Sequence, residues 1–387
     1  MKDDSGKMIS FSVLINIFVF SSIAIILLKI VFRNDYVVLR QDVRFIMICL
    51  ILIMLRLFIP IESPRVSRIP VFRVYPDIYR FLRRPLFFVD NGQVSFLRLL
   101  VIMWIIGAVI MMLSRVYSYY STVRRVKSYK GLVDKEFDSV LKKINAEYAK
   151  STEFRLVVSE DTDTAYIFGI IKPYIVIPEG VEWNRQEIYF ILKHEVLHFY
   201  RGDILIRALC EILKAVYWWN PFIYMLGRLV VNMQEINVDF KVIKGLPGVE
   251  QLDYSDCLIK VARDGKKRRE KKGWEMGFRK ESPSVIHKRI SLMLKSLKID
   301  RKRTVASLML SIVILCLINL CPSVFIFEPY SKVEADTEGT IGVREGNIYY
   351  IKNSDDTYDI YINNEYYKTV LEVFDEKVPV YYNLNEQ

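Results

Sequence analysis

The sequence predicts a polytopic α-helical membrane protein with an α+β domain inserted before its last span and a small β-rich C-terminal tail. Hydrophobic residues make up 52% of the 387 residues, and the mean hydropathy is +0.19. Both values are high for a soluble globular chain. The apolar residues are concentrated in a few long runs, which favours membrane spans over one large core.

Four apolar runs are candidate spans, at residues 9–32, 45–59, 94–113 and 304–327. About 20 apolar residues are needed to cross a bilayer. The run at 45–59 is shorter and contains Arg56, so a buried or interfacial helix is the alternative there. The first run is too long for the apolar core of a signal peptide and no small-residue cleavage site follows it, so we expect a retained anchor.

Basic flanks orient these spans. Residues 115–303 begin and end with clusters of lysine and arginine, which mark the cytoplasmic side, whereas the tail 328–387 is acidic and is expected to be exported. The loop 61–93 carries six arginines although it should lie outside, so its side stays open. The net charge of +11 is concentrated beside the spans, which predicts contact with anionic lipid and no direct nucleic-acid binding.

The sequence pattern of 115–303 predicts a domain of helices and short strands. Apolar residues at helical spacing predict an amphipathic helix at 132–149, and strands are expected at 154–159, 165–171 and 174–177. The stretch 204–231 is apolar but contains four charged residues, which argues against a fifth span. It should pack inside the domain or against the membrane face, with Trp218 and Trp219 near the interface.

One helix in this domain carries the pattern H-E-x-x-H. His194 and His198 are two of only three histidines in the chain, and residues four apart share one face of a helix. They can therefore bind one zinc ion through their imidazoles, with Glu195 as general base. The helix should begin near 183–184 and end at Arg201-Gly202. The five cysteines show no spacing typical of disulfides or metal sites.

A catalytic zinc site needs a third protein ligand and one exchangeable water. Glu235 and Asp239 lie four residues apart on a later helix. Glu235 is the candidate ligand, and Asp239 could accept a hydrogen bond from a ligand histidine. A solvated acidic helix face is the alternative for this pair. Asp203 is either a support for a ligand histidine or only the N-cap of the next helix.

The order of these motifs resembles the BlaR/MecR antirepressor family of membrane zinc peptidases of the gluzincin type. The resemblance covers roughly residues 1–327 and includes Arg201-Gly202-Asp203, Trp218-Trp219-Asn220-Pro221, E-x-x-x-D at 235–239, the strand region 168–178 and His287-Lys288-Arg289-Ile290. It implies a gluzincin-type cytoplasmic metallopeptidase domain that is switched on by an extracellular sensor. The peptidase would then cleave itself and promote cleavage of a DNA-binding repressor.

The tail departs from the best-known members of that family. Those carry a penicillin-binding sensor with a serine in an S-x-x-K motif, whereas neither Ser331 nor Ser354 has a lysine three positions on. The tail instead predicts strands at 348–351 and 358–362 and is rich in tyrosine. These rings either form the core of a small β unit or contact an extracellular ligand or partner.

We therefore expect a multi-pass zinc endopeptidase of the bacterial cytoplasmic membrane that takes part in signalling. Glu195 would take a proton from the attacking water and pass it to the leaving amine. The substrate would lie along an edge strand from 165–177, with Arg289 and His287 as candidate oxyanion donors. The charged stretch 264–284 is either an exposed linker that is cut during self-cleavage or a lipid-binding loop.

Two other functions remain open on the sequence alone. A housekeeping membrane gluzincin that removes damaged proteins would share the zinc site. A non-enzymatic receptor could hold a structural zinc, although such a site would be closed by four ligands and would not need Glu195.

Overall fold

The structure of the chain is a computed structural model that divides into two compact units, residues 1–69 with 80–328 and residues 70–79 with 329–387. The residues that it describes are 11–41, 43–59, 67–71, 78, 81–82, 85–89, 92–132, 134–148, 152–272, 283–296, 305–316, 325–329, 348–353, 357–362, 365–370, 373 and 379–381. The candidate site lies in the first unit.

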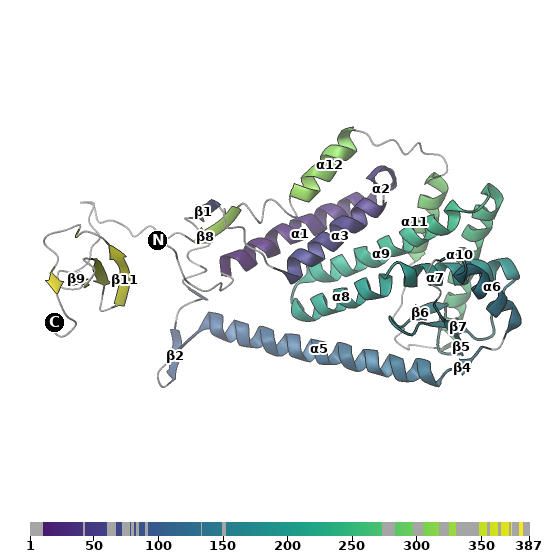
Figure 1. Ribbon diagram of the computed structural model, residues 1–387, viewed down its shortest axis with the longest axis horizontal. Coiled ribbons are helices and arrows are strands. Elements are labelled where there is room, and N and C mark those ends of the chain that lie inside the picture. The colour runs from purple at the N-terminus through teal and green to yellow at the C-terminus, as the bar shows by residue number, and fades with distance from the viewer. Residues whose placement is uncertain are drawn as a thin grey trace. The chain divides into compact units, whose positions relative to one another are not determined.

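An apolar helical group opens the first unit. Helices α1 (Phe11–Arg33) and α3 (Val43–Phe58) pack together, with the short helix α2 (Asp35–Gln41) between them in the chain. The side chain of Asn34 accepts a hydrogen bond from the backbone N–H of Tyr36 at 3.0 Å and so caps α2. Figure 1 shows α1 and α3 side by side, with α8 and α9 below them.

Among the described residues, two helices are long and apolar enough to cross a membrane, Ile15–Arg33 within α1 and Phe96–Ser128, which is α5. They coincide with the predicted spans 9–32 and 94–113, of which residues 9 and 10 lie outside the described residues. The helix α5 is capped by Ser95, whose hydroxyl accepts a hydrogen bond from the backbone N–H of Arg98, and it continues well past the predicted end of the span.

The structure does not show four spans. The predicted run at 45–59 is the 16-residue helix α3, which is short for a crossing. The predicted run at 304–327 begins with α12 (Val305–Leu315) but ends in strand β8 (Phe325–Pro329), and 317–324 lie outside the described residues. The Phe-Ile-Phe sequence at the start of β8 favours a strand over a continued helix.

In the described residues, the predicted loop 61–93 holds strands β1 and β2 and the start of β3. β1 (Ser67–Val71) forms a two-stranded sheet with β8, and β2 (Pro85–Val89) pairs antiparallel with β3 (Gly92–Ser95) just before α5. The side of the membrane on which this arginine-rich loop lies stays a prediction.

A four-stranded sheet supports the candidate site. Its order is β4 (Lys130–Gly131), β5 (Arg155–Ser159), β7 (Tyr174–Pro178) and β6 (Tyr166–Phe168). β5 and β7 are parallel, and the two outer strands are antiparallel to their neighbours. The three strands expected from the sequence are β5, β6 and β7, and β6 ends just before Gly169, whose φ of 101° favours glycine.

Helices α6 (Lys135–Asn145) and α7 (Arg185–Tyr200) pack against one face of this sheet. The apolar stripe of α6 is buried, as the sequence pattern predicts for an amphipathic helix, and meets Ile175 and Ile177 of β7. The helix α7 starts at Asn184 with a capping box, in which the Asn184 and Glu187 side chains each bond the other residue's backbone.

The stretch 204–231 forms a helical hairpin of α8 (Asp203–Val216) and α9 (Pro221–Lys244). Asn220 caps α9 and Pro221 fills its first turn. The hairpin packs against the apolar group and against α5, where the Trp104 indole donates to the Val216 carbonyl at 2.6 Å. Trp218 donates back to the Trp104 carbonyl, so the tryptophans contact the candidate spans themselves.

Two further helices complete the unit, α10 (Gly248–Lys272) and α11 (Pro283–Ser296). The prediction of an exposed linker at 264–284 is therefore wrong for residues 264–272 and for 283–284, which are helical. Lysine, arginine and glutamate are good helix formers, and this outweighs the single Gly265. The remaining residues, 273–282, lie outside the described residues.

The second unit contains a small sheet of order β11, β10, β9 and β12, formed by Glu365–Val370, Tyr358–Ile362, Ile348–Lys352 and Val380–Tyr381. Two of its strands are those predicted from the tail. Tyr349 and Tyr350 are buried, and the Tyr349 ring stacks on Tyr361 with centroids 5.2 Å apart. These tyrosines therefore form part of the core of the unit.

Candidate metal centre

Helix α7 presents both histidines on the face opposite the sheet. His194 and His198 are 8% and 1% exposed, and their rings meet edge to face at 4.8 Å. The helix ends at Arg201, and Gly202 with a φ of 70° turns the chain sharply into α8. The histidines therefore lie near the C-terminal end of α7, beside the start of the α8–α9 hairpin.

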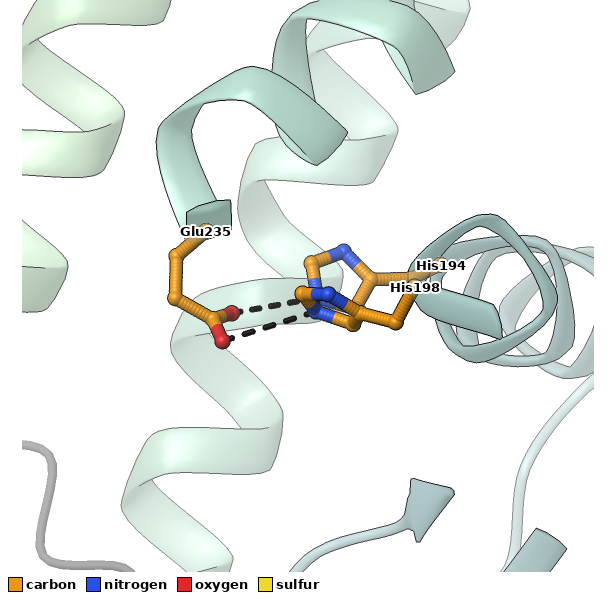
Figure 2. Close-up of side chains that lie close together, drawn as sticks. All are labelled: His194, His198 and Glu235. Carbon is orange, nitrogen blue, oxygen red and sulfur yellow. Dashed lines mark hydrogen bonds and ion pairs between the residues drawn. The ribbon is translucent and has the colours of Figure 1, made fainter. Parts of the chain in front are cut away.

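Glu235 of α9 lies opposite the two histidines (Figure 2). The two Nε2 atoms are 3.1 Å apart, and the Glu235 carboxylate oxygens lie 3.2 Å from His194 Nε2 and 3.4 Å from His198 Nε2. Ligand atoms at about 2.0 Å from a tetrahedral zinc are about 3.3 Å from one another. The three donor groups thus have the spacing that a tetrahedral metal ion requires.

His198 is supported by Asp203, the first residue of α8. Its Nδ1 lies 2.8 Å from Asp203 Oδ2, and both side chains are 1% exposed. A donating Nδ1–H leaves Nε2 as the atom free to bind a metal. The N-cap of α8 is Gly202 and no side chain caps it, so the capping role considered for Asp203 is wrong.

His194 is supported through a residue that the sequence did not reveal. Its Nδ1 lies 2.9 Å from the hydroxyl of Tyr254 in α10, and that hydroxyl donates to Asp239 Oδ1 at 2.7 Å. Asp239 itself is 3.4 Å from His194 Nδ1. Asp239 therefore lies near His194, and the Tyr254 hydroxyl makes the shorter contact with the histidine.

Asp239 is held in turn by Arg289 of α11. The Arg289 guanidinium donates Nε to Oδ2 at 2.7 Å and Nη2 to Oδ1 at 2.8 Å, a two-point contact that is fully buried. Arg289 thus lies in the site, but its guanidinium is already hydrogen-bonded to the Asp239 carboxylate. His287, the other candidate oxyanion donor, is exposed on α11, and the oxyanion roles of both stay predictions.

Glu235 is placed by a second arginine. The Nη2 atom of Arg207 in α8 lies 2.8 Å from Glu235 Oε1, while Arg207 Nε donates to Gln234 at 2.7 Å. In the sequence, Arg207 is only one of the four charged residues that argue against a membrane span at 204–231. An arginine nine positions after His198 and four after Asp203 belongs to no motif that would assign it to the Glu235 carboxylate.

The electrostatics of the site favour a bound cation. Burial would raise the pKa of Glu235, but positive charge on His198 and the bonds to both histidines hold that pKa well below its usual value. Burial would lower the pKa of His194, but its bonds to Asp239 and Glu235 raise it to about 9. The buried carboxylates therefore stay ionised and stabilise positive charge between them.

Glu195 follows His194 directly and is 6% exposed. Its Oε2 atom is buried and has no hydrogen-bond partner among the residues that the structure describes. Burial of an unpaired carboxylate oxygen is costly, so such an atom is a mark of function. A group with two imidazoles, one carboxylate ligand and a second free carboxylate can hold a divalent metal beside a proton acceptor.

Comparison with known proteins agrees with this geometry. A family model described as BlaR1 peptidase M56 matches residues 88–293, more than half of the chain, including all of the site residues named above. The chain is also 30% identical over 158 residues to the regulatory protein BlaR1 of Bacillus licheniformis, which covers 41% of this chain and 26% of that relative.

The methicillin resistance mecR1 protein of Staphylococcus aureus is 30% identical over 106 residues, which is 27% of this chain and 18% of the relative. The corresponding protein of Staphylococcus epidermidis gives the same values. The matches thus span about a quarter or less of the length of these curated relatives. With a match over more than half of its length and a buried His-His-Glu group, the chain belongs to the BlaR1 peptidase M56 family.

Proposed function

We propose that the chain is a membrane-bound zinc endopeptidase. The observation that carries this proposal is the convergence of His194, His198 and Glu235, whose ligand atoms have the mutual spacing of a tetrahedral zinc site. A structural zinc would be closed by four protein ligands. Among the described residues the group has three, which favours a catalytic centre over a structural one.

The chain's own residues account for the proton transfers that peptide hydrolysis requires. Bound zinc would polarise the scissile carbonyl and make the attacking water more acidic. Glu195 would accept the proton of that water on its free carboxylate oxygen and deliver it to the leaving amine. Asp203 and the Tyr254–Asp239 pair would keep both histidines in the tautomer that binds metal.

The substrate is proposed to bind along β6. This strand lies at the outer side of the sheet and pairs with β7 alone among the described strands. An edge strand offers backbone hydrogen bonds to an extended peptide, which adds to the sheet as another strand. Such a site selects a segment that can be extended rather than one fixed in a helix.

The proposed role is that of an antirepressor in a signalling system, in which the peptidase cleaves itself or a cytoplasmic repressor after an extracellular signal. Support comes from the relatives, which are named as a regulatory protein and as methicillin resistance proteins. The self-cleavage site is proposed within 273–282, because the helices on both sides of that stretch cannot enter an extended-strand cleft.

The proposed topology places 115–303 in the cytoplasm and the tail outside, with 45–59 and 304–327 completing four spans. Cysteines introduced at 130–150 should resist a membrane-impermeant thiol reagent, and cysteines introduced at 340–387 should react. Cys49, Cys210 and Cys257 are buried, and Cys316 and Cys321 are replaced by serine before labelling to keep the background low. Labelling of 130–150 from outside would contradict this topology and would also exclude a cytoplasmic repressor as substrate.

Chelation tests the proposed activity. Membranes that contain the full chain are stripped of zinc with a chelator, then given zinc or magnesium, and the fragments are mapped by mass spectrometry. Self-cleavage should stop on stripping and return with zinc only. Fragments that continue to form in the chelator at the original rate would exclude a zinc peptidase.

A further inference from the structure

A cavity lies between α3 and the end of α9, and none of the three candidate metal ligands lines it. Its volume is about 400 Å³, and it is lined by Arg44, Met47, Ile48, Arg201, Asn237 and Lys241. Three of these six side chains are cationic, and none is acidic. Like charges at close range repel one another, so such a lining is stable only with a counter-charge at hand.

The charge of Lys241 itself has little compensation. Burial and the nearby Arg201 and Arg44 lower the pKa of Lys241, and only Asp203 acts in the opposite direction. Asp203 is already bonded to His198. Within the described part of the chain, Lys241 has no hydrogen-bond or ion-pair partner, and the 6% exposed Asn237 has none for its amide.

We propose that this cavity binds a phosphate group, either the headgroup of an anionic phospholipid or free phosphate. Two guanidinium groups match the geometry of phosphate oxygens, an ammonium group adds a third positive charge, and the amide of Asn237 offers a further donor. A net-neutral ligand would leave the repulsion among Arg44, Arg201 and Lys241 in place.

The position of the cavity favours the lipid as the source. Arg44 lies in the first turn of α3, which is the cytoplasmic end of that helix in the proposed topology. Ile48 and Leu55 continue the same helix face and are 52% and 49% exposed. Acyl chains could therefore run along α3 while the headgroup occupies the cavity, as basic pockets beside membrane helices allow.

The full chain in a neutral detergent tests this site without any need for peptidase activity. Thermal unfolding is followed while short-chain phosphatidylglycerol, short-chain phosphatidylcholine or inorganic phosphate is added. Phosphatidylglycerol should raise the unfolding temperature saturably, by roughly 2 °C at about ten times its dissociation constant, and phosphatidylcholine should not. Inorganic phosphate that produces the same rise at the same concentration would identify free phosphate as the ligand.

Matched variants locate the effect. Lys241→Gln and Arg44→Gln should each abolish the rise, whereas Lys244→Gln, one turn further along α9 and outside the cavity, should keep it. Arg201 is left unchanged because its Nε lies 3.6 Å from Asp203. An equal response to both lipids, or an equal response of Lys241→Gln and Lys244→Gln, would overturn the proposal.

Discussion

The two histidines of the candidate metal centre are supported in different ways. His198 bonds Asp203, which follows it by five residues across the turn at Gly202. His194 bonds Tyr254, which bonds Asp239, which is held by Arg289. The first support is built within one local turn of the chain, whereas the second is assembled from α9, α10 and α11.

This difference ties one side of the site to α2, which lies between α1 and α3 in the chain. Lys288, Ser291 and Lys295 of α11 all contact Asp35 of α2, while Arg289 of the same helix contacts Asp239. A change in the position of α11 should therefore reach His194 and leave the support of His198 intact. Four substitutions test this contrast, in order of decreasing expected effect.

Arg289→Met should have the largest effect, because it leaves Asp239 as a buried charge without its cation. Removal of one partner of a buried ion pair lowers the free energy of unfolding by about 3–5 kcal/mol. Thermal or denaturant unfolding of the full chain in detergent measures the loss. His287→Gln, at an exposed position of the same helix, is the control. A stable Arg289→Met protein would show that the long-range support carries no structural weight.

Asp203→Ala should act mainly on the metal. Loss of a carboxylate that bonds a ligand histidine typically weakens metal binding by about 10–100-fold. Competition with a chromophoric chelator gives the zinc affinity, and Asp253→Ala removes an exposed carboxylate as the control. Unchanged affinity in Asp203→Ala would mean that the local support does not position His198.

Tyr254→Phe removes only the hydroxyl between His194 and Asp239. Because Asp239 lies 3.4 Å from His194 and could take over part of the contact, the expected loss of zinc affinity is about tenfold. The visible spectrum of the cobalt-substituted protein should shift as well, since the ligand field of His194 changes. Identical affinity and spectrum in wild type and variant would assign the support to Asp239 alone.

Asp35→Asn should have the smallest effect, about 1 kcal/mol at neutral pH. Burial alone would raise the pKa of Asp35, but bonds from Lys288, Lys295 and Ser291 lower it from 3.8 to about 2. The stabilisation is therefore complete above pH 3.8 and is lost as the pH falls toward 2. The difference in unfolding temperature between wild type and variant should be larger at pH 6 than at pH 3, and a constant difference would contradict the ion-pair account.

The sequence predicted the local parts of the fold and site well. The H-E-x-x-H spacing, the Asn184 start of α7 and the break at Gly202 are written in a few consecutive residues, and the structure has helix, cap and turn at those places. The E-x-x-x-D pair on α9 could be predicted for the same reason, because helical periodicity alone puts both carboxylates on one face.

The remaining parts depend on how distant segments dock. Nothing near Tyr254 or Arg207 distinguishes these residues from an ordinary core tyrosine or a surface arginine, and only the packing of α10 and α8 on α7 and α9 gives them their partners. The prediction for 264–272 was wrong for another reason. High charge is typical of an exposed linker, but lysine, arginine and glutamate also favour a helix.

The most direct test of the central claim compares zinc content and self-cleavage in the wild type, Glu195→Gln and Glu235→Ala. The wild type and Glu195→Gln should each hold about one zinc per chain, while cleavage by Glu195→Gln falls by at least about 100-fold because only the proton acceptor is lost. Glu235→Ala should lose zinc and activity together. Wild-type cleavage by the Glu195→Gln protein, or undiminished zinc in Glu235→Ala, would contradict the assignment of this site.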